Sequence, residues 1–155
     1  MTLYINGRFL CQPLSGVQRF SHEILDAFDR RLHADEVFRE MIGPVVALCP
    51  RGSRRRTEWK QISVTTVGDT LGHIWEQGAL YRASKAGVLL SLGNAGPLRH
   101  SAHILALHDA NIWAIPYAFS SRYGVFHKAL RPLLARRAQR LITVSRFSAG
   151  RLAHH

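Results

Sequence analysis

The sequence predicts an α/β fold in which a parallel sheet carries helices on both faces. Short apolar runs alternate along the chain with longer segments of helical period, and this alternation is typical of such a sheet. The chain has 155 residues, which suits one domain, and 46% hydrophobic with 20% charged residues is a globular composition. Polar clusters follow several of the apolar runs, where ligands of parallel sheets gather.

The first half of the chain is expected to supply three strands and one long helix. Leu3–Ile5 begins the first strand, and Val45–Cys49 and the alternating segment Ile62–Thr66 read as two more. Ser15 is placed to cap the helix between the first two. Apolar residues then recur at steps of three and four, the stripe of an amphipathic helix: Val17, Phe20, Ile24, Phe28 and Leu32.

The second half continues the alternation. Three apolar runs are expected to be strands: Gly87–Leu92, His103–Leu107 and Leu141–Val144. Helical period is found over Leu71–Ser84, over Phe119–Arg140 and from Arg146 onward. Pro132 lies inside the second of these helices and is expected to break or kink it. Together the elements predict a Rossmann-like sheet whose polar loops share one edge.

Charge is the unusual feature of the composition. Lys and Arg total 21 against 10 acidic residues, a formal net charge of +11. This excess favours an anionic partner, which includes nucleic acid, an anionic membrane surface or a phosphate-bearing substrate. The basic loop Arg51–Arg56 supports a nucleic-acid-binding protein as an alternative function. The sequence has no RNP-like aromatic motif, recognisable helix-turn-helix or zinc pattern that would mark a specific nucleic-acid site.

No exported or membrane-spanning segment is expected. The longest apolar stretches are far shorter than the roughly 20 residues that span a bilayer, and the amino terminus lacks a secretory signal pattern. Cys11 and Cys49 form no CxxC pair, and reduced thiols in a cytoplasmic protein are expected. The segment Tyr123–Arg140 interleaves basic and apolar residues. It fits either peripheral contact with an anionic inner membrane surface or a surface helix packed on its own core.

Three polar clusters are candidate functional sites. The connection Asn6–Gly16 joins the first strand to the first helix, and its glycines and the helix amino terminus favour an anion such as a diphosphate; an ordinary turn is the alternative. His108 and Asp109 follow a strand and face the ligand edge, or they satisfy a turn. Ser145 either binds substrate or caps the following helix. No third ligand completes a metal site, and no GxSxG elbow is present.

Several runs occur in a definite order along the chain: Asn6–Phe20, Ile74–Gln77, Leu90–Leu98, Leu107–Asn111 and Leu141–Ser148. In this order they resemble the amino-terminal domain of the family-4 (group 1) glycosyltransferases of the GT-B fold. Each run is loose, whereas the ordered set covers nearly the whole chain. The loop has a single glycine, Gly16, where members of the family often have two.

The resemblance implies retaining transfer of a hexose from a nucleotide-sugar to a glycan or lipid-linked acceptor, with no metal or other cofactor. It places the loop of Ser15, Gly16 and Val17 beside the donor diphosphate. It directs His108 to the transferred sugar and gives Asp109 a positioning role. The acceptor side would then be lined by four residues: Asn94, Gly96, Asn111 and Ser145.

The resemblance also implies a cleft between two Rossmann-like domains, of which residues 1–155 are the acceptor-side one. The carboxy-terminal, donor-binding domain is expected to be absent from this chain. We therefore expect weak donor binding and little turnover by the chain alone, and a partner chain or homodimer over the exposed domain face. A Rossmann-like interaction module without catalysis is a further alternative.

Overall fold

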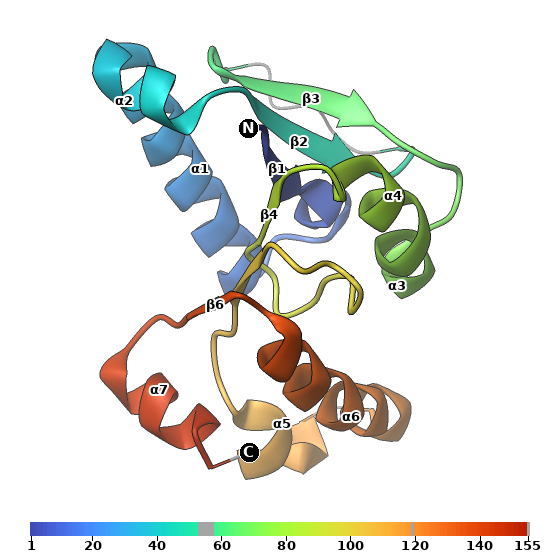
Figure 1. Ribbon diagram of the computed structural model, residues 1–155. Helices are drawn as coiled ribbons and strands as arrows, with labels where there is room; N and C mark the ends of the chain where they lie inside the picture. The colour runs from blue at the N-terminus through green and yellow to red at the C-terminus, as the bar shows by residue number, and fades with distance from the viewer. Residues whose placement is uncertain (53–57, 119, 155) are drawn as a thin grey trace.

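A computed structural model describes residues 1–52, 58–118 and 120–154 of the chain. It confirms the α/β fold: six parallel strands form one sheet in the order β3-β2-β1-β4-β5-β6 (Figure 1). The strands are β1 (Leu3–Asn6), β2 (Val45–Cys49), β3 (Ile62–Thr66), β4 (Val88–Ser91), β5 (His103–Ala106) and β6 (Arg140–Ile142). This is the order of a doubly wound sheet, in which the chain reverses its direction of travel between β1 and β4.

Helices connect these strands. The longest are α1 (Gly16–Ala34) and α6 (Ser121–Arg137). The shorter helices are α2 (Glu36–Ile42), α3 (Gly72–Trp75), α4 (Tyr81–Ser84), α5 (Asn111–Ala114) and α7 (Arg146–Leu152). A 3₁₀ turn, η1 (Gly7–Cys11), follows β1, and a second, η3 (116–118), follows α5. Between α3 and α4 the π-helical segment η2 (Glu76–Leu80) keeps the helix continuous over the predicted range. Such π-helical turns occur frequently at functional sites.

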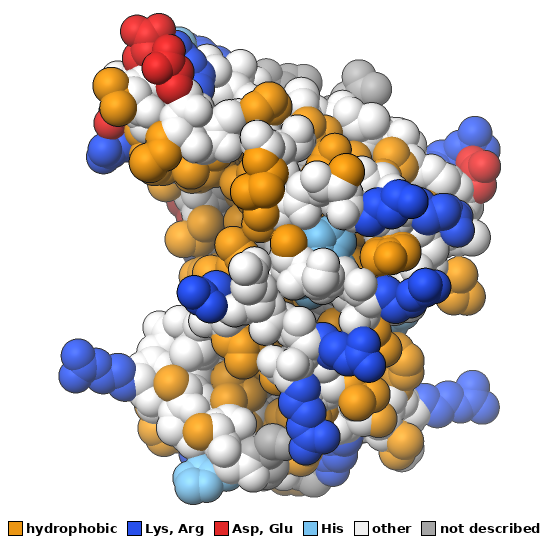
Figure 2. Space-filling view, in the orientation of Figure 1, with side chains coloured by type: hydrophobic (Ala, Val, Ile, Leu, Met, Phe, Trp, Pro, Cys, Tyr) orange, Lys and Arg blue, Asp and Glu red, His pale blue; other side chains and the backbone are white. Residues whose placement is uncertain are grey.

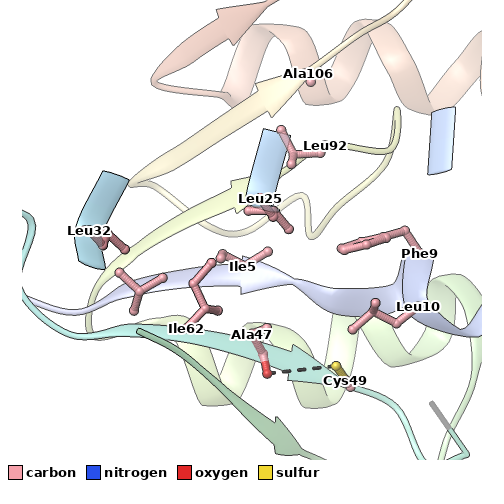
Figure 3. Packing of buried hydrophobic residues seen from close by; sticks show 11 residues of the cluster. Ile5, Phe9, Leu10, Leu25, Leu32, Ala47, Cys49, Ile62, Leu92 and Ala106 are labelled. Carbon is pink, nitrogen blue, oxygen red and sulfur yellow. Dashed lines mark hydrogen bonds between the residues drawn. The ribbon is translucent and has the colours of Figure 1, made fainter. Parts of the chain in front are cut away.

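Both faces of the sheet are covered, as predicted. In Figure 1, α1 lies on one side of the sheet, and α3, α4 and α6 lie on the other. The α1 side is packed by Leu25 and Leu32 against Ile5 and Ala47, part of the cluster drawn in Figure 3. The opposite side of the sheet holds two clusters, which include strand residues that point away from α1. One cluster is formed by Leu48, Trp75, Leu80 and Leu89. The other is formed by Leu105, Leu107, Leu130 and Leu134. This alternation follows from the two-residue period of a strand.

The start of β3 is fixed to α1 by a buried carboxylate. Asp29 on α1 is 5% exposed, and it accepts backbone N–H bonds from Lys60 (2.9 Å), Gln61 (2.8 Å) and Ile62 (2.9 Å). Of the predicted basic loop Arg51–Arg56, only Arg51 and Gly52 precede the gap at 53–57. The rest of that loop, residues 53–56, lies outside the described residues.

Pro132 was predicted to break or kink its helix. The predicted break is wrong, because α6 continues through Pro132 to Arg137. Proline removes one N–H, which leaves the carbonyl four residues earlier without its helical partner. That residue is the exposed Lys128, so water can replace the missing donor. β2 and β3 have their predicted bounds, and the ends of the other strands shifted by one or two residues, most at β6, which ends at Ile142 rather than Val144.

Candidate functional site

The reversal point of the sheet lies between β1 and β4, and the loops that leave these two strands diverge there. Parallel strands bring their carboxyl ends to one edge, so a crevice opens at this point. Asn6 ends β1 and Ser91 ends β4, and both side chains are buried. The Asn6 amide donates to the Ser91 hydroxyl over 3.3 Å and to Oε1 of Glu76 over 2.9 Å. The crevice therefore has a polar floor that joins both strands to η2.

Glu76 is the centre of this floor and is only 1% exposed. Its Oε2 accepts a hydrogen bond from Nη1 of Arg8 at 2.9 Å and lies 2.7 Å from Nδ1 of His73. Burial on its own raises the pKa of Glu76, but the hydrogen bond to His73, the charge of Arg8 and the Asn6 amide together hold the pKa below its ordinary value. Glu76 is therefore an anion that fixes the position of the Arg8 guanidinium.

His103 extends the polar floor toward β5. Its Nε2 lies 2.9 Å from the Ser91 hydroxyl, and its side chain is 1% exposed. Burial, assisted by His100 nearby, lowers the pKa of His103 to about 4. At neutral pH the imidazole of His103 is uncharged. The Ser91 hydroxyl therefore joins two neutral groups, the His103 ring and the Asn6 amide.

A cavity of about 160 Å³ opens above this floor. Three segments far apart in the sequence line it: the connection between β1 and α1, the loop after β4, and the start of α6. Its lining residues are Arg8, Gln12, Ser15, Val17, Gln18, Gly93, Asn94, Ala95, Tyr123 and His127. Amide, hydroxyl, imidazole and guanidinium groups predominate, so the cavity suits a ligand rich in hydrogen-bonding groups.

The amino terminus of α1 forms one side of the cavity. Ser15 occupies the cap position, but its side chain makes no capping bond to the helix backbone. Its hydroxyl instead donates to Oε1 of Gln18, whose Nε2 donates to Gln12 over 3.0 Å. The first-turn N–H groups of this 19-residue helix are thus left without a side-chain cap. Such groups and the positive end of the helix dipole attract anions.

His127, on α6, lines the same cavity with an imidazole. The residue is 3% exposed, and its Nδ1 is buried with no hydrogen-bond partner among the described residues. Burial, followed by the charges of Arg131, His73 and Arg8, lowers the pKa of His127 to about 4. The ring of Tyr123 lies 4.1 Å away between centroids. At neutral pH His127 therefore offers the cavity a neutral imidazole, which is suited to a hydroxyl group.

The structure brings several of the predicted site residues together here. Ser15, Val17 and Asn94 line the cavity, and Gly16 lies between the first two. Asn94 adopts a left-handed backbone (φ 61°), and its Oδ1 accepts from the backbone N–H of His108 at 2.8 Å. The His108 Nε2–H donates to the Leu92 carbonyl at 2.7 Å, so His108 holds the loop after β4 against the end of β5.

The other predicted residues do not line this cavity. Oδ1 of Asp109 accepts from the backbone N–H of Asn111 at 2.9 Å. Gly96 packs so close to His103 that an added Cβ would be 2.6 Å from the ring. Ser145 caps α7, because its hydroxyl accepts from the Ser148 N–H at 3.0 Å.

Sequence reasoning gave no role to five polar residues that build the site. Arg8, Gln18 and Glu76 lay within the ordered runs, but nothing there marked them as neighbours. The spacing of His73 and Glu76, three residues apart in a helix, placed them on one face and was the available signal. His127 carried no signal, because a histidine in a basic helix usually faces water.

Positive charge is concentrated in the second half of the chain. From residue 77 onward the sequence holds 11 Lys and Arg but a single acidic residue, Asp109. Figure 2 shows the same asymmetry: most acidic side chains in this view lie near α2, and Lys and Arg are spread over the middle and lower parts. The half of the domain that carries β4, β5 and β6 therefore attracts anions from solution.

Comparison of the chain with protein-family models, with curated proteins and with solved structures gave no significant match. The described part of the chain brings no three His, Cys, Asp or Glu side chains together as a metal-binding group. None of its helices is both long and apolar enough to cross a membrane.

Proposed function

We propose that this chain is a glycosyltransferase domain that binds a nucleotide-sugar at the crevice between β1 and β4. The observation that carries the proposal is the polar cavity in which the uncapped amino terminus of α1 meets the loop of Asn94. The ordered sequence runs that resemble family-4 glycosyltransferases support the same assignment. The reaction would be retaining transfer of a hexose to a glycan or lipid-linked acceptor, without a metal.

The cavity offers two kinds of contact that such a ligand needs. Backbone N–H groups of the first turn of α1 would face a diphosphate, which carries most of the ligand's charge. Arg8 adds less attraction than its charge suggests, because Glu76 already pairs with it at 2.9 Å. The anion is therefore held mainly by the helix terminus and by the positive field of the second half of the chain.

Sugar hydroxyls would be recognised by uncharged groups. Gln18, Asn94 and the neutral His127 each donate or accept hydrogen bonds, and each hydroxyl of a hexose can both donate and accept. In this arrangement His108 is a positioning residue, because its ring is bonded to the Leu92 carbonyl and its backbone N–H to Asn94. Asp109 would act in the same way through Asn111.

Binding of nucleotide diphosphates to the 155-residue chain tests the proposal. We expect UDP or GDP, and the corresponding nucleotide-sugars, to shift the amide resonances of residues 15–18 and 93–95 in NMR titrations. The change Gln18→Leu should weaken binding at least about fivefold, which corresponds to one lost hydrogen bond of about 1 kcal/mol. Gln139→Leu, at an exposed glutamine next to β6, is the matched control and should bind as the wild type does.

Transfer itself requires a second measurement. Release of free nucleotide from a nucleotide-sugar should be slow with this chain alone, and any transfer product should show retention of the anomeric configuration. Shifts confined to α6 and α7, or equal binding of arbitrary DNA and nucleotide-sugar with a steep salt dependence, would contradict the proposal and favour a general polyanion-binding protein.

A further inference from the structure

A second cavity, of about 290 Å³, lies at the other end of the sheet among α5, α6, α7 and β6. It shares no lining residue with the cavity at the α1 terminus. Its wall is mostly apolar and is formed by these residues: Leu107, Trp113, Arg131, Pro132, Ala135, Leu141, Ile142, Thr143, Ala149, Leu152 and Ala153. An apolar cavity of this size with a few polar groups is the usual form of a small-molecule site.

The polar groups in this wall are unusual. Arg131 is only 3% exposed, although an arginine is rarely buried without a full set of partners. Its Nη1 donates to the backbone carbonyl of Asp109 at 3.1 Å and lies 3.7 Å from the carboxylate Oδ1 of the same residue. Its Nε is buried with no hydrogen-bond partner among the described residues. The guanidinium is therefore only loosely paired with an anion.

Thr143 also has a buried polar atom without a hydrogen-bond partner among the described residues. Its hydroxyl oxygen is buried without a partner in the described part of the chain, and the residue lines the same cavity as Arg131. Leaving a buried donor or acceptor unsatisfied costs free energy in the folded protein. Both residues line the same apolar cavity, and a polar group of a ligand bound there would supply partners that the described residues do not.

We propose that this cavity binds a small molecule with an apolar body and one carboxylate. The planar guanidinium of Arg131 matches the geometry of a carboxylate, and the Thr143 hydroxyl can donate to the same group. The apolar wall takes the body of the ligand. A phosphate dianion fits poorly, because the Asp109 carboxylate lies beside Arg131, the one Lys or Arg in the described wall of this cavity. This proposal stands independently of the nucleotide-sugar site.

Titration with octanoate tests the proposal on the 155-residue chain. We expect saturable binding by calorimetry, a rise in melting temperature with octanoate concentration, and shifts of the amide resonances of α6, α7 and Thr143. Octanol and octanamide have the same body without the charge, and they should bind at least tenfold more weakly. Equal binding of the three compounds, or no binding of octanoate, would overturn the proposal.

Two variants separate the site from a general effect on folding. Ala135→Leu fills the cavity and should reduce octanoate affinity at least tenfold. Ala129→Leu, at an exposed position of the same helix outside the cavity, is the matched control and should leave the affinity unchanged.

Thr143→Val removes a hydroxyl that has no partner among the described residues, so the melting temperature of the free chain should not fall. Its octanoate affinity should nevertheless drop severalfold. Unchanged affinity in both Ala135→Leu and Thr143→Val would show that octanoate binds elsewhere and would refute the assignment.

Discussion

Replacement of Glu76 by Gln is expected to destabilise the folded chain by about 2–3 kcal/mol. The variant keeps one carbonyl oxygen to accept the Asn6 amide, but it directs an NH₂ group toward Arg8 and His73. Breaking a buried ion pair by changing one partner costs about 3–5 kcal/mol. The lower figure applies here because the side chains of Arg8 and His73 are 20% and 26% exposed, so water recovers part of the loss.

Equilibrium urea unfolding followed by circular dichroism at pH 7 measures this loss. Glu23→Gln, at an exposed glutamate of α1, is the control and should stay within about 0.5 kcal/mol of the wild type. A loss below about 1 kcal/mol for Glu76→Gln would refute the reasoning, because it would mean that the buried charge is not paired as the structure has it.

The loss of stability in Glu76→Gln should depend on pH. The pKa of Glu76 is lowered in the folded state, so its stabilisation is fully present above the ordinary value of 4.5 and is lost as the pH falls through the folded-state value. The difference between wild type and Glu76→Gln should therefore be constant from pH 7 to about pH 5 and should shrink at lower pH. A difference that grows on acidification would contradict the assigned direction.

Three further changes test other parts of the fold. Asp29→Ala removes the acceptor of three backbone N–H groups, of which only that of Ile62 belongs to a buried residue. We therefore expect the free energy of unfolding, measured in urea, to fall by about 3 kcal/mol. His103 should titrate near pH 4 by NMR. Since its unfolded pKa is near 6.5, its own contribution to stability should fall by up to about 3 kcal/mol between pH 6.5 and pH 4, and titration near 6.5 would disprove this. Gly96→Ala places a Cβ 2.9 Å from the Ser91 hydroxyl and should cost about 1–3 kcal/mol in the same urea assay, with no loss if the loop moves freely.

The sheet and its main helices could be predicted because their signals are local. The stripe from Val17 to Leu32 has the helical period, and runs such as Val45–Cys49 are short, apolar and bounded by turn residues. Strand order is not local. It depends on which apolar faces α1 and α3 bury. The sequence predicted no strand order, and the reversal between β1 and β4 is known only from the structure.

The polar floor of the candidate site could not be predicted for a similar reason. Arg8 and Glu76 are 68 residues apart, and their pairing exists only after β1 and η2 pack together. Ser15 was correctly placed at the helix start, but its hydroxyl turns to Gln18 instead of the backbone. Competition between two local hydrogen bonds of similar strength decides that choice, and sequence spacing does not resolve it.

The helix of residues 121–137 packs on the core of its own domain, which was one of the two alternatives, but periodicity did not predict which polar side chains it buries. Its interleaved basic and apolar residues predicted either a membrane contact or an ordinary surface helix. In the structure its inward face carries His127 and Arg131 beside Leu130 and Leu134, while Val125 is 72% exposed. Polar side chains thus occupy positions that packing alone would give to apolar ones, and this reversal is typical of sites that bind ligands.

Buried polar groups without partners are not spread evenly over the described chain. Four such side-chain atoms are found, and all belong to residues between 100 and 143: Nδ1 of His100, Nδ1 of His127, Nε of Arg131 and Oγ1 of Thr143. The same half carries 11 basic residues against one acidic residue. Each unsatisfied group costs about 1–3 kcal/mol, a large amount for a domain of this size. The half with β1, β2 and β3 instead satisfies its buried carboxylates fully, as Asp29 and Glu76 show. The first half of the sheet thus pairs its buried charges, whereas the second half retains the unpaired groups and the positive field.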